Sequence, residues 1–297
     1  MTFRARFAPS PTGPLHLGHA YSALLGFDMA MREGGEWLLR IEDIDRQRSK
    51  PEWERQIYED LEWLGLWWPE PVMRQSERAE VYSSVLNGLW WDDAVFECTC
   101  SRADILAAAS APQEGAPLVG PDGVVYPGTC EGNRSMGGLY PRRFPDAALR
   151  LNMGLTTQVT AERPVTEPAY LSFRETGAGP NGEKGLICVP ESDLVRNVGD
   201  VVLARRGMGT SYHLSVVLDD AAQFVTHVVR GQDLFEATKI HVVLQRLLGL
   251  PTPVYHHHRL IRDDTGRRLA KREDAKAIRR YRDEGATPQD IRRMVGL

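Results

Sequence analysis

The first ninety residues alternate between short apolar runs and longer amphipathic segments. Residues 4–8 and 36–41 are short apolar runs that predict strands. The apolar segment 17–31 has few helix breakers and ends at Gly34-Gly35, which predicts a helix between the two strands. Further helices are predicted over 51–64 and 77–90. Strand–helix–strand alternation of this kind indicates a parallel sheet, in which ligands bind beyond the carboxyl ends of the strands.

The pattern changes near residue 96 and resumes near residue 200. Residues 96–195 begin with a region rich in Cys, Gly and Pro and continue with segments that predict short strands and turns. From residue 201 onward, a strand, a turn and helices over 212–220 and 240–248 are predicted again. We interpret 96–195 as an insertion between two halves of the sheet.

The length and composition are typical of a globular protein. At 297 residues, the expected number of domains is about two. No apolar run approaches the roughly 18 residues that a membrane span needs, and the first residues lack a signal-peptide core. We therefore expect a cytoplasmic protein with no membrane contact. The tryptophan pairs at 67–68 and 90–91 are predicted to pack in the core or between domains.

The charge is unevenly distributed. The net charge of the chain is −4, but residues 259–297 contain 12 Lys and Arg against 7 Asp and Glu, a local excess of +5. The other 258 residues therefore carry −9. This basic end is either a surface that binds phosphate groups or a solvated helical face.

The N-terminal stretch 7–19 contains the most distinctive chemistry. Its prolines favour an extended backbone, and His16 and His19 then fall three residues apart at the start of the predicted helix. The N–H groups and dipole of a helix N-terminus attract phosphate, and two imidazoles there add further donors. Taken alone, the pair could also be ordinary core or surface histidines, or half of a metal site.

Three of the four cysteines lie close together in the sequence. Cys98, Cys100 and Cys130 form this group, and in a cytosolic chain such a group favours metal over disulfides. Three thiolates and one further donor complete a tetrahedral zinc site. Tyr126, Glu97 and Glu131 are the candidates for the fourth ligand. Cys188 is predicted to be a buried free thiol.

Two stretches together resemble a known family. Residues 7–19 resemble the first signature of class I aminoacyl-tRNA synthetases, and the Ala-Pro-Ser-Pro-Thr-Gly form resembles the glutamyl and glutaminyl branch. Residues 263–272 resemble the second signature, usually written Lys-Met-Ser-Lys. Here Lys271 keeps the second lysine, while Arg268 replaces the first lysine and Ala270 replaces the serine.

The resemblance implies a fold and a division of the chain. The expected fold class is α/β: a Rossmann-type class I synthetase catalytic domain with an inserted zinc-containing α+β subdomain and a short, helical, basic C-terminal end. The expected parts are the first half of the Rossmann-type domain (1–95), the inserted subdomain (96–195), the second half (196–258), and the second signature with the basic helical segment (259–297).

The resemblance also implies an activity and a set of site residues. The family joins an amino-acid carboxylate to the α-phosphate of ATP, with Mg²⁺ accompanying the ATP. His16, His19 and Lys271 are the expected catalytic residues. The expected ATP-binding residues are Pro9, His16, Gly18, His19, Arg268 and Lys271. The expected glutamate-binding residues are Arg6, Ser10, Glu42, Tyr212 and Arg230. The expected zinc ligands are Cys98, Cys100, Tyr126 and Cys130.

Three features favour a short branch of this family. Only 25 residues follow Arg272, Val216 stands where the discriminating glutamyl enzymes have Asn, and the three cysteines with Tyr126 resemble the short form. That form is expected to activate glutamate without tRNA, as a monomer, and to transfer it to queuosine at the wobble position in the anticodon stem-loop of tRNA(Asp). A truncated glutamyl-tRNA synthetase and a non-catalytic tRNA-binding paralogue are the alternatives.

Overall fold

Two sheets form the centre of the molecule. The computed structural model describes residues 2–109, 118–133, 147–160, 169–262 and 276–297. In the first sheet β1 (Arg4–Phe7), β2 (Glu36–Ile41) and β3 (Met73–Arg74) are parallel and lie in that order. The second sheet has the order β11-β12-β8-β9, and its strands are β11 (His227–Gly231), β12 (Val254–His258), β8 (Tyr170–Glu175) and β9 (Gly185–Pro190). Only its β8–β9 pair is antiparallel.

The two sheets meet side by side at β1 and β11. The N–H of Thr226 donates to the carbonyl of Arg4 (2.9 Å), and the N–H of Arg4 donates to Thr226 Oγ1 (2.8 Å). Phe7, Glu42, Arg230 and His258, which lie at or just beyond the carboxyl ends of β1, β2, β11 and β12, line one cavity, so these ends face the same edge. This edge is where parallel sheets of this kind bind ligands.

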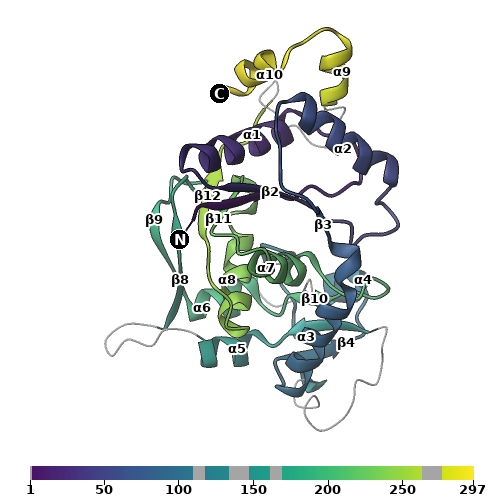
Figure 1. Cartoon of the computed structure of the whole chain (residues 1–297). Helices are drawn as coiled ribbons and strands as arrows, with labels where there is room; N and C mark the ends of the chain where they lie inside the picture. Colours follow the sequence, from purple (N-terminus) through teal and green to yellow (C-terminus); the bar gives the residue numbers. More distant parts are fainter. Residues whose placement is uncertain (1, 110–117, 134–146, 161–168, 263–275) are drawn as a thin grey trace.

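Helices cover both faces of the joined sheets (Figure 1). On one face lie α1 (Leu17–Arg32) and α2 (Pro51–Trp63), and on the other lie α7 (Tyr212–Ala222) and α8 (Ala237–Leu247). Each face has its own apolar core, the first around Leu24, Trp37 and Leu61 and the second around Leu214 and Val243. The strand–helix alternation predicted for the first ninety residues is confirmed.

A third, antiparallel sheet lies at the far end of the molecule. Its order is β10-β7-β4, with β10 (Val202–Ala204), β7 (Ala148–Leu151) and β4 (Val95–Cys98). Near it lie α3 (Ala79–Trp91), α4 (Arg102–Ala109), α5 (Met153–Thr160), and the short hairpin of β5 (Val119–Gly120) and β6 (Gly123–Val124). Strand pairing crosses the predicted boundary at residue 195, because β10 pairs with β7 while β8 pairs with β12.

Two short helices end the chain, and the second packs against α1. α9 spans Ile278–Asp283 and α10 spans Pro288–Val295. Thr287 caps α10 in a capping box with Asp290, and Pro288 occupies its first turn, so the sequence itself marks this helix start. Ile291 and Val295 enter the core with α1, and Arg292 binds both oxygens of Asp28 (2.7 and 2.9 Å). The predicted helical C-terminal end is confirmed.

Two packing predictions are wrong in part. Cys188 is exposed, because it lies on β9 at the edge of the sheet. Trp67 and Trp91 are 60% and 55% exposed, so only one member of each pair, Trp68 or Trp90, packs into an apolar core. Within the described residues, no helix has both the length and the apolar character that crossing a membrane requires.

Candidate active site

The two N-terminal histidines cap helix α1. His16 is the N-cap, and its Nδ1 accepts the N–H of Gly18 (3.1 Å), while Nδ1 of His19 accepts the N–H of His16 (3.1 Å). A ring nitrogen that accepts an N–H carries no hydrogen, so the Nε2 of each neutral ring carries it. The centroids of the two rings are 3.8 Å apart, and the ring planes are tilted by 31°. The cap thus makes both Nε2 atoms hydrogen-bond donors at a helix N-terminus.

Gly18 is required by the same cap. A Cβ at this position would lie 3.0 Å from Cε1 and 3.1 Å from Nδ1 of His16, closer than side chains normally pack. The absence of a side chain therefore lets the His16 ring fold back over the first turn.

One cavity brings the two predicted groups of ligand-binding residues together. It has a volume of about 290 Å³ and lies at the carboxyl edge of β1 and β11. Among its lining residues are the expected ATP-binding residues Pro9, His16, Gly18 and His19 and the expected glutamate-binding residues Arg6, Ser10, Glu42, Tyr212 and Arg230. Segments more than two hundred residues apart in the sequence thus form a single pocket.

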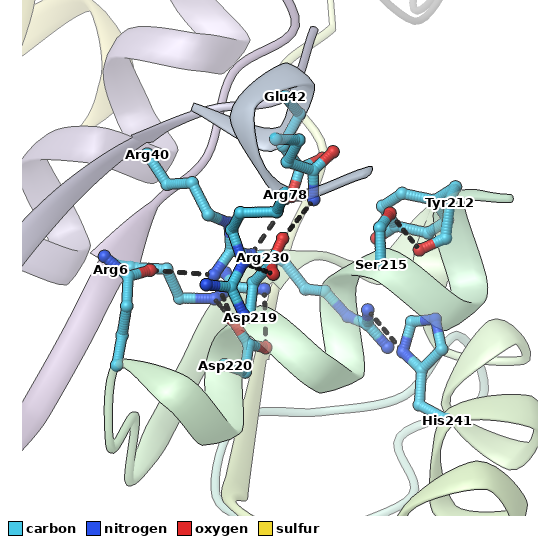
Figure 2. Close-up of polar contacts among 12 residues, drawn as sticks. Arg6, Arg40, Glu42, Arg78, Tyr212, Ser215, Asp219, Asp220, Arg230 and His241 are labelled. Atoms are coloured by element: carbon cyan, nitrogen blue, oxygen red, sulfur yellow. Dashed lines mark hydrogen bonds and ion pairs between the residues drawn. The ribbon is translucent and has the colours of Figure 1, made fainter. Parts of the chain in front are cut away.

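A buried network of charges forms one wall of this cavity (Figure 2). Arg6 donates to both oxygens of Asp220 (2.8 and 3.2 Å), and Arg40 donates to Asp220 Oδ1 (2.7 Å) and Glu42 Oε1 (3.1 Å). Burial alone would raise the pKa of Asp220, but the charges of Arg6 and Arg40 hold it below its ordinary value. Asp220 thereby holds two arginines in place beneath the cavity.

Glu42 is less well compensated than Asp220. Burial raises its pKa above the ordinary value, and Arg40 and Arg6 offset only part of that rise. A cation placed beside Glu42 would stabilise the carboxylate form. The cavity thus has a carboxylate suited to an ammonium group.

Arg230 also lines the cavity and is 5% exposed. Its guanidinium donates to His257 Nε2 (3.1 Å), His241 Nδ1 (3.1 Å), Thr238 Oγ1 (2.7 Å) and the carbonyl of Leu234 (3.1 Å). Of the residues that the structure describes, none with a carboxylate pairs with Arg230 directly. A buried cation held by neutral groups is suited to bind an anionic substrate group.

The second signature lies outside the described residues. Arg268 and Lys271 both fall in 263–275, so their predicted roles stay predictions. The residues on either side of that segment border the cavity. Leu260 and Ile261 line it, and Ala277 pairs with His16 across an isolated β-bridge, with the N–H of Ile278 donating to the carbonyl of Leu15 (2.8 Å).

The predicted metal ligands form a compact cluster. The Sγ atoms of Cys98, Cys100 and Cys130 lie within 4.8 Å of one another, and those of Cys100 and Cys130 are 3.5 Å apart. The Tyr126 hydroxyl is 3.6 Å from Cys98 Sγ and 3.7 Å from Cys100 Sγ. In a tetrahedral site with Zn–S bonds of about 2.3 Å, the ligand atoms are about 3.8 Å apart, so these four residues fit zinc.

Two features of the cluster bear on its chemistry. Burial alone would raise the pKa of the Cys130 thiol. Hydrogen bonds with the Tyr126 hydroxyl and the N–H of Thr99 outweigh burial and lower this pKa to about 7, which favours the thiolate. In the described part of the chain, no carboxylate oxygen joins the three sulfurs, so the cluster gives no support to Glu97 or Glu131 as the fourth ligand.

Sequence reasoning missed several members of the site. Arg40 and Asp220 were not predicted, although a charged residue inside the apolar run 36–41 was a visible signal. Sequence reasoning also missed the histidines that are hydrogen-bonded to Arg230 directly or in series, because no local motif marks them. These are His257, His241 and His213. Val216 lies on α7 and is buried in the apolar core around Leu214 and Val243.

His258 lines the cavity and links stability to pH. Burial lowers its pKa from 6.5 to about 4, so the folded protein keeps it neutral where the unfolded chain binds a proton. We expect the free energy of unfolding to fall by about 2 kcal/mol from this group as the pH drops from about 7.5 to about 5. The free energy of unfolding, measured in urea at both pH values, should therefore fall by about 2 kcal/mol more in the wild type than in His258→Gln. An equal loss in both proteins would contradict the assignment.

Comparisons with known proteins identify the class of this chain. Residues 2–115 and 188–297 match the model of the catalytic domain of class I tRNA synthetases (E and Q). A solved glutamate tRNA ligase from Elizabethkingia meningosepticum, in complex with its amino acid, superposes with a TM-score of 0.74 at 26% identity. The match covers all of this chain and 61% of the ligase. The chain therefore spans less than two thirds of the length of this ligase. The fold and the site thus define a class I tRNA synthetase catalytic domain.

Two sequence relatives identify the family within this class. The glutamyl-Q tRNA(Asp) synthetase of Rhodobacter capsulatus is 61% identical over 98% of this chain and 99% of its own length. That of Methylococcus capsulatus is 38% identical over 99% of this chain and 83% of its own. The chain belongs to the glutamyl-Q tRNA(Asp) synthetase family.

Proposed function

We propose that the protein activates glutamate with ATP in the absence of tRNA and then transfers the glutamyl group to queuosine in the anticodon loop of tRNA(Asp). In the first step, a glutamate carboxylate oxygen bonds to the α-phosphorus of ATP and pyrophosphate leaves. In the second, the acceptor oxygen on the modified base bonds to the glutamyl carbonyl carbon and AMP leaves. The names of the relatives support the acceptor, and the cavity supports the activation.

In the first step, the start of α1 is proposed to bind the phosphates of ATP. The Nε2–H groups of His16 and His19, together with the helix dipole, stabilise negative charge that develops on the phosphates. Arg268 and Lys271 are proposed to add cations, since the residues on both sides of their segment border the cavity. Mg²⁺ bound with ATP would neutralise part of the triphosphate charge.

Three charged residues that line the cavity are proposed to bind glutamate. Glu42, whose pKa burial raises, is proposed to pair with the substrate ammonium. Arg230, which has no direct carboxylate partner in the described structure, is proposed to pair with a substrate carboxylate. Arg6, oriented by Asp220, supplies a second cation for the other carboxylate. Two carboxylates and one ammonium thus meet two cations and one anion.

A single observation supports the activation step most strongly: the capped helix start and the buried Arg230 line one cavity. The test is ATP–pyrophosphate exchange with glutamate and without tRNA. We expect exchange with glutamate and little with glutamine. A tRNA-dependent exchange would indicate a truncated glutamyl-tRNA synthetase, and no exchange with or without tRNA would indicate a non-catalytic paralogue.

A second cavity offers a route for the acceptor. It has a volume of about 310 Å³, shares Ser10, Glu42 and Tyr212 with the first cavity, and is also lined by Arg48 and Arg205. Arg205 further lines a cavity of about 620 Å³ beside the antiparallel sheet, with Arg102, Arg150 and Arg206. Cations along such a path suit a phosphate backbone. We propose that the anticodon loop approaches along this arginine-lined path.

Arg205 provides the test of this route. We expect Arg205→Ala to weaken transfer to tRNA about tenfold and to lower its salt dependence by about one phosphate contact, while glutamate-dependent pyrophosphate exchange is unchanged. Arg55→Ala is the matched control, because Arg55 is an exposed arginine on α2, outside the path. Equal transfer rates in the two variants would contradict the route.

We also propose that Cys98, Cys100, Tyr126 and Cys130 hold a structural zinc. The geometry fits four ligands with no open position, so the metal's contribution would be to fix the end of β4 against the Tyr126–Cys130 turn.

Metal analysis of cysteine variants tests this site. We expect about one zinc per chain in the wild type, nearly none in Cys130→Ser, and a wild-type content in Cys188→Ser, whose thiol is exposed and lies outside the cluster. Tyr126→Phe should bind zinc more weakly than the wild type. Full zinc content in Cys130→Ser, measured by plasma mass spectrometry, would overturn the assignment.

A further inference from the structure

Arg230 is held by two histidines whose hydrogen bonds run in a fixed direction. A guanidinium has five N–H groups and can only donate. Four of the five have acceptors: Nε meets His257, one N–H of Nη1 meets His241, and both N–H groups of Nη2 meet Thr238 and Leu234. No acceptor within the described structure takes the other N–H of Nη1, and Arg230 lines the cavity.

The first histidine arm is short and ends in a carboxylate. Since His257 Nε2 accepts from Arg230, its Nδ1 carries the hydrogen and donates to Glu175 Oε2 (2.5 Å). Both side chains are fully buried. Burial would raise the pKa of Glu175, but its hydrogen bonds to His257 lower it, so the carboxylate is ionised. Glu175 also accepts the N–H groups of His257 (3.0 Å) and Gly177 (2.7 Å).

The second arm is longer and reaches the surface. His241 Nδ1 accepts from Arg230, so its Nε2 carries the hydrogen and donates to His213 Nδ1 (3.2 Å). His213 Nε2 then carries a hydrogen and faces Asp122 Oδ1 at 3.5 Å. His241 and His213 are 2% and 6% exposed, and burial beside Arg230 lowers the pKa of His241 well below its ordinary value, so this ring is neutral. Each link in the arm thus sets the hydrogen position of the next.

We infer that His241 and His213, ending at Asp122, are positioning residues that hold Arg230 for the side-chain carboxylate of the substrate. The inference rests on the proposed glutamate activation. Its basis is the charge arrangement: neutral imidazoles contact the guanidinium, and the carboxylates stand at least one residue further away. Arg230 is therefore oriented without being neutralised.

The second arm also joins distant parts of the chain. Asp122 lies in the turn between β5 and β6, four residues before Tyr126, whereas Arg230 lies near the carboxyl end of β11. The arm therefore connects the segment with the candidate zinc ligands to the cavity through α7 and α8, which carry His213 and His241.

Four variants of α8 and α7 separate positioning from packing. His241→Leu removes the acceptor for Arg230, whereas His241→Asn keeps an oxygen where Nδ1 stands. Val242→Ala is the control, because Val242 is the next residue of α8 and equally buried but belongs to the apolar core. His213→Leu, one step further from Arg230, covers the case in which His241→Leu does not fold.

The measurement is the KM for glutamate and for ATP in pyrophosphate exchange, with the glutamate Kd from calorimetry and the melting temperature. We expect His241→Leu to raise the glutamate KM and Kd about tenfold with the ATP KM unchanged, His213→Leu to raise them about threefold, and His241→Asn to restore most of the loss. Val242→Ala should lower the melting temperature alone. A wild-type glutamate KM in both leucine variants, or an equal rise in Val242→Ala, would overturn the inference.

The calorimetric Kd separates this inference from the proposed function. If the wild type binds glutamate but shows no exchange, the proposed activation fails, while a rise of Kd in His241→Leu with restoration in His241→Asn still supports the positioning role. Exchange in the wild type with unchanged Kd in the leucine variants would overturn the positioning role alone.

Discussion

We expect His19→Asn to lower the turnover of glutamate-dependent pyrophosphate exchange by about 10²- to 10³-fold, with little change in stability. The oxygen of asparagine can take the place of Nδ1 and still accept the N–H of His16, so the cap of α1 remains. The Nε2–H donor is lost, and with it a contact to the charge that develops on phosphate.

Two comparison variants make this result specific to the Nε2–H group. Ser22→Ala changes another residue that lines the cavity and should leave turnover near the wild-type value. His19→Ala should lose the same activity and, in addition, about 1 kcal/mol of stability with the cap. Near wild-type turnover in His19→Asn would show that α1 does not act on the phosphates.

The second large effect is expected at Arg230. Arg230→Gln should lower kcat/KM for glutamate by about 10²- to 10³-fold, because it removes a buried charge proposed to pair with a carboxylate. Preference for glutamate over glutamine should fall as well. Pyrophosphate exchange with both amino acids measures the effect, and circular dichroism confirms that the variant is folded.

Arg230→Lys is the informative partner of this variant. Lysine keeps the charge but has no planar fork to meet His257, His241 and Thr238 together, so we expect partial recovery. An unchanged glutamate preference in Arg230→Gln would assign the substrate side chain to another part of the cavity, such as Arg6.

Local patterns predicted the parts of the fold that depend on local forces. The strand–helix–strand unit at the N-terminus follows from apolar periodicity. The C-terminal end was predicted to be helical, but the Thr-Pro-x-Asp cap that begins α10 was recognised only in the structure. The exposure of Cys188 could not be predicted, because it depends on β9 being an edge strand. The partners of β8 and β10 are likewise long-range, and no local pattern specifies them.

The same distinction holds within the site. His16 and His19 lie in one recognisable stretch, whereas Arg6 meets Asp220 across 214 positions in the sequence. The stretch that contains Arg230 resembles the glutamyl branch of class I synthetases. The hydrogen bonds from Arg230 to His241 and His257, however, depend on how α8 and β12 pack. Motifs could thus identify residues of the site, while their orientation required the tertiary structure.

The most direct test of the account is transfer of labelled glutamate to two purified samples of tRNA(Asp), one with queuosine and one with guanosine at the wobble position. We predict label on the queuosine sample alone, released by mild base and retained when the 3′ end of the tRNA is cut off. Label that is lost with the 3′ end, or that appears only on tRNA(Glu), would contradict the account.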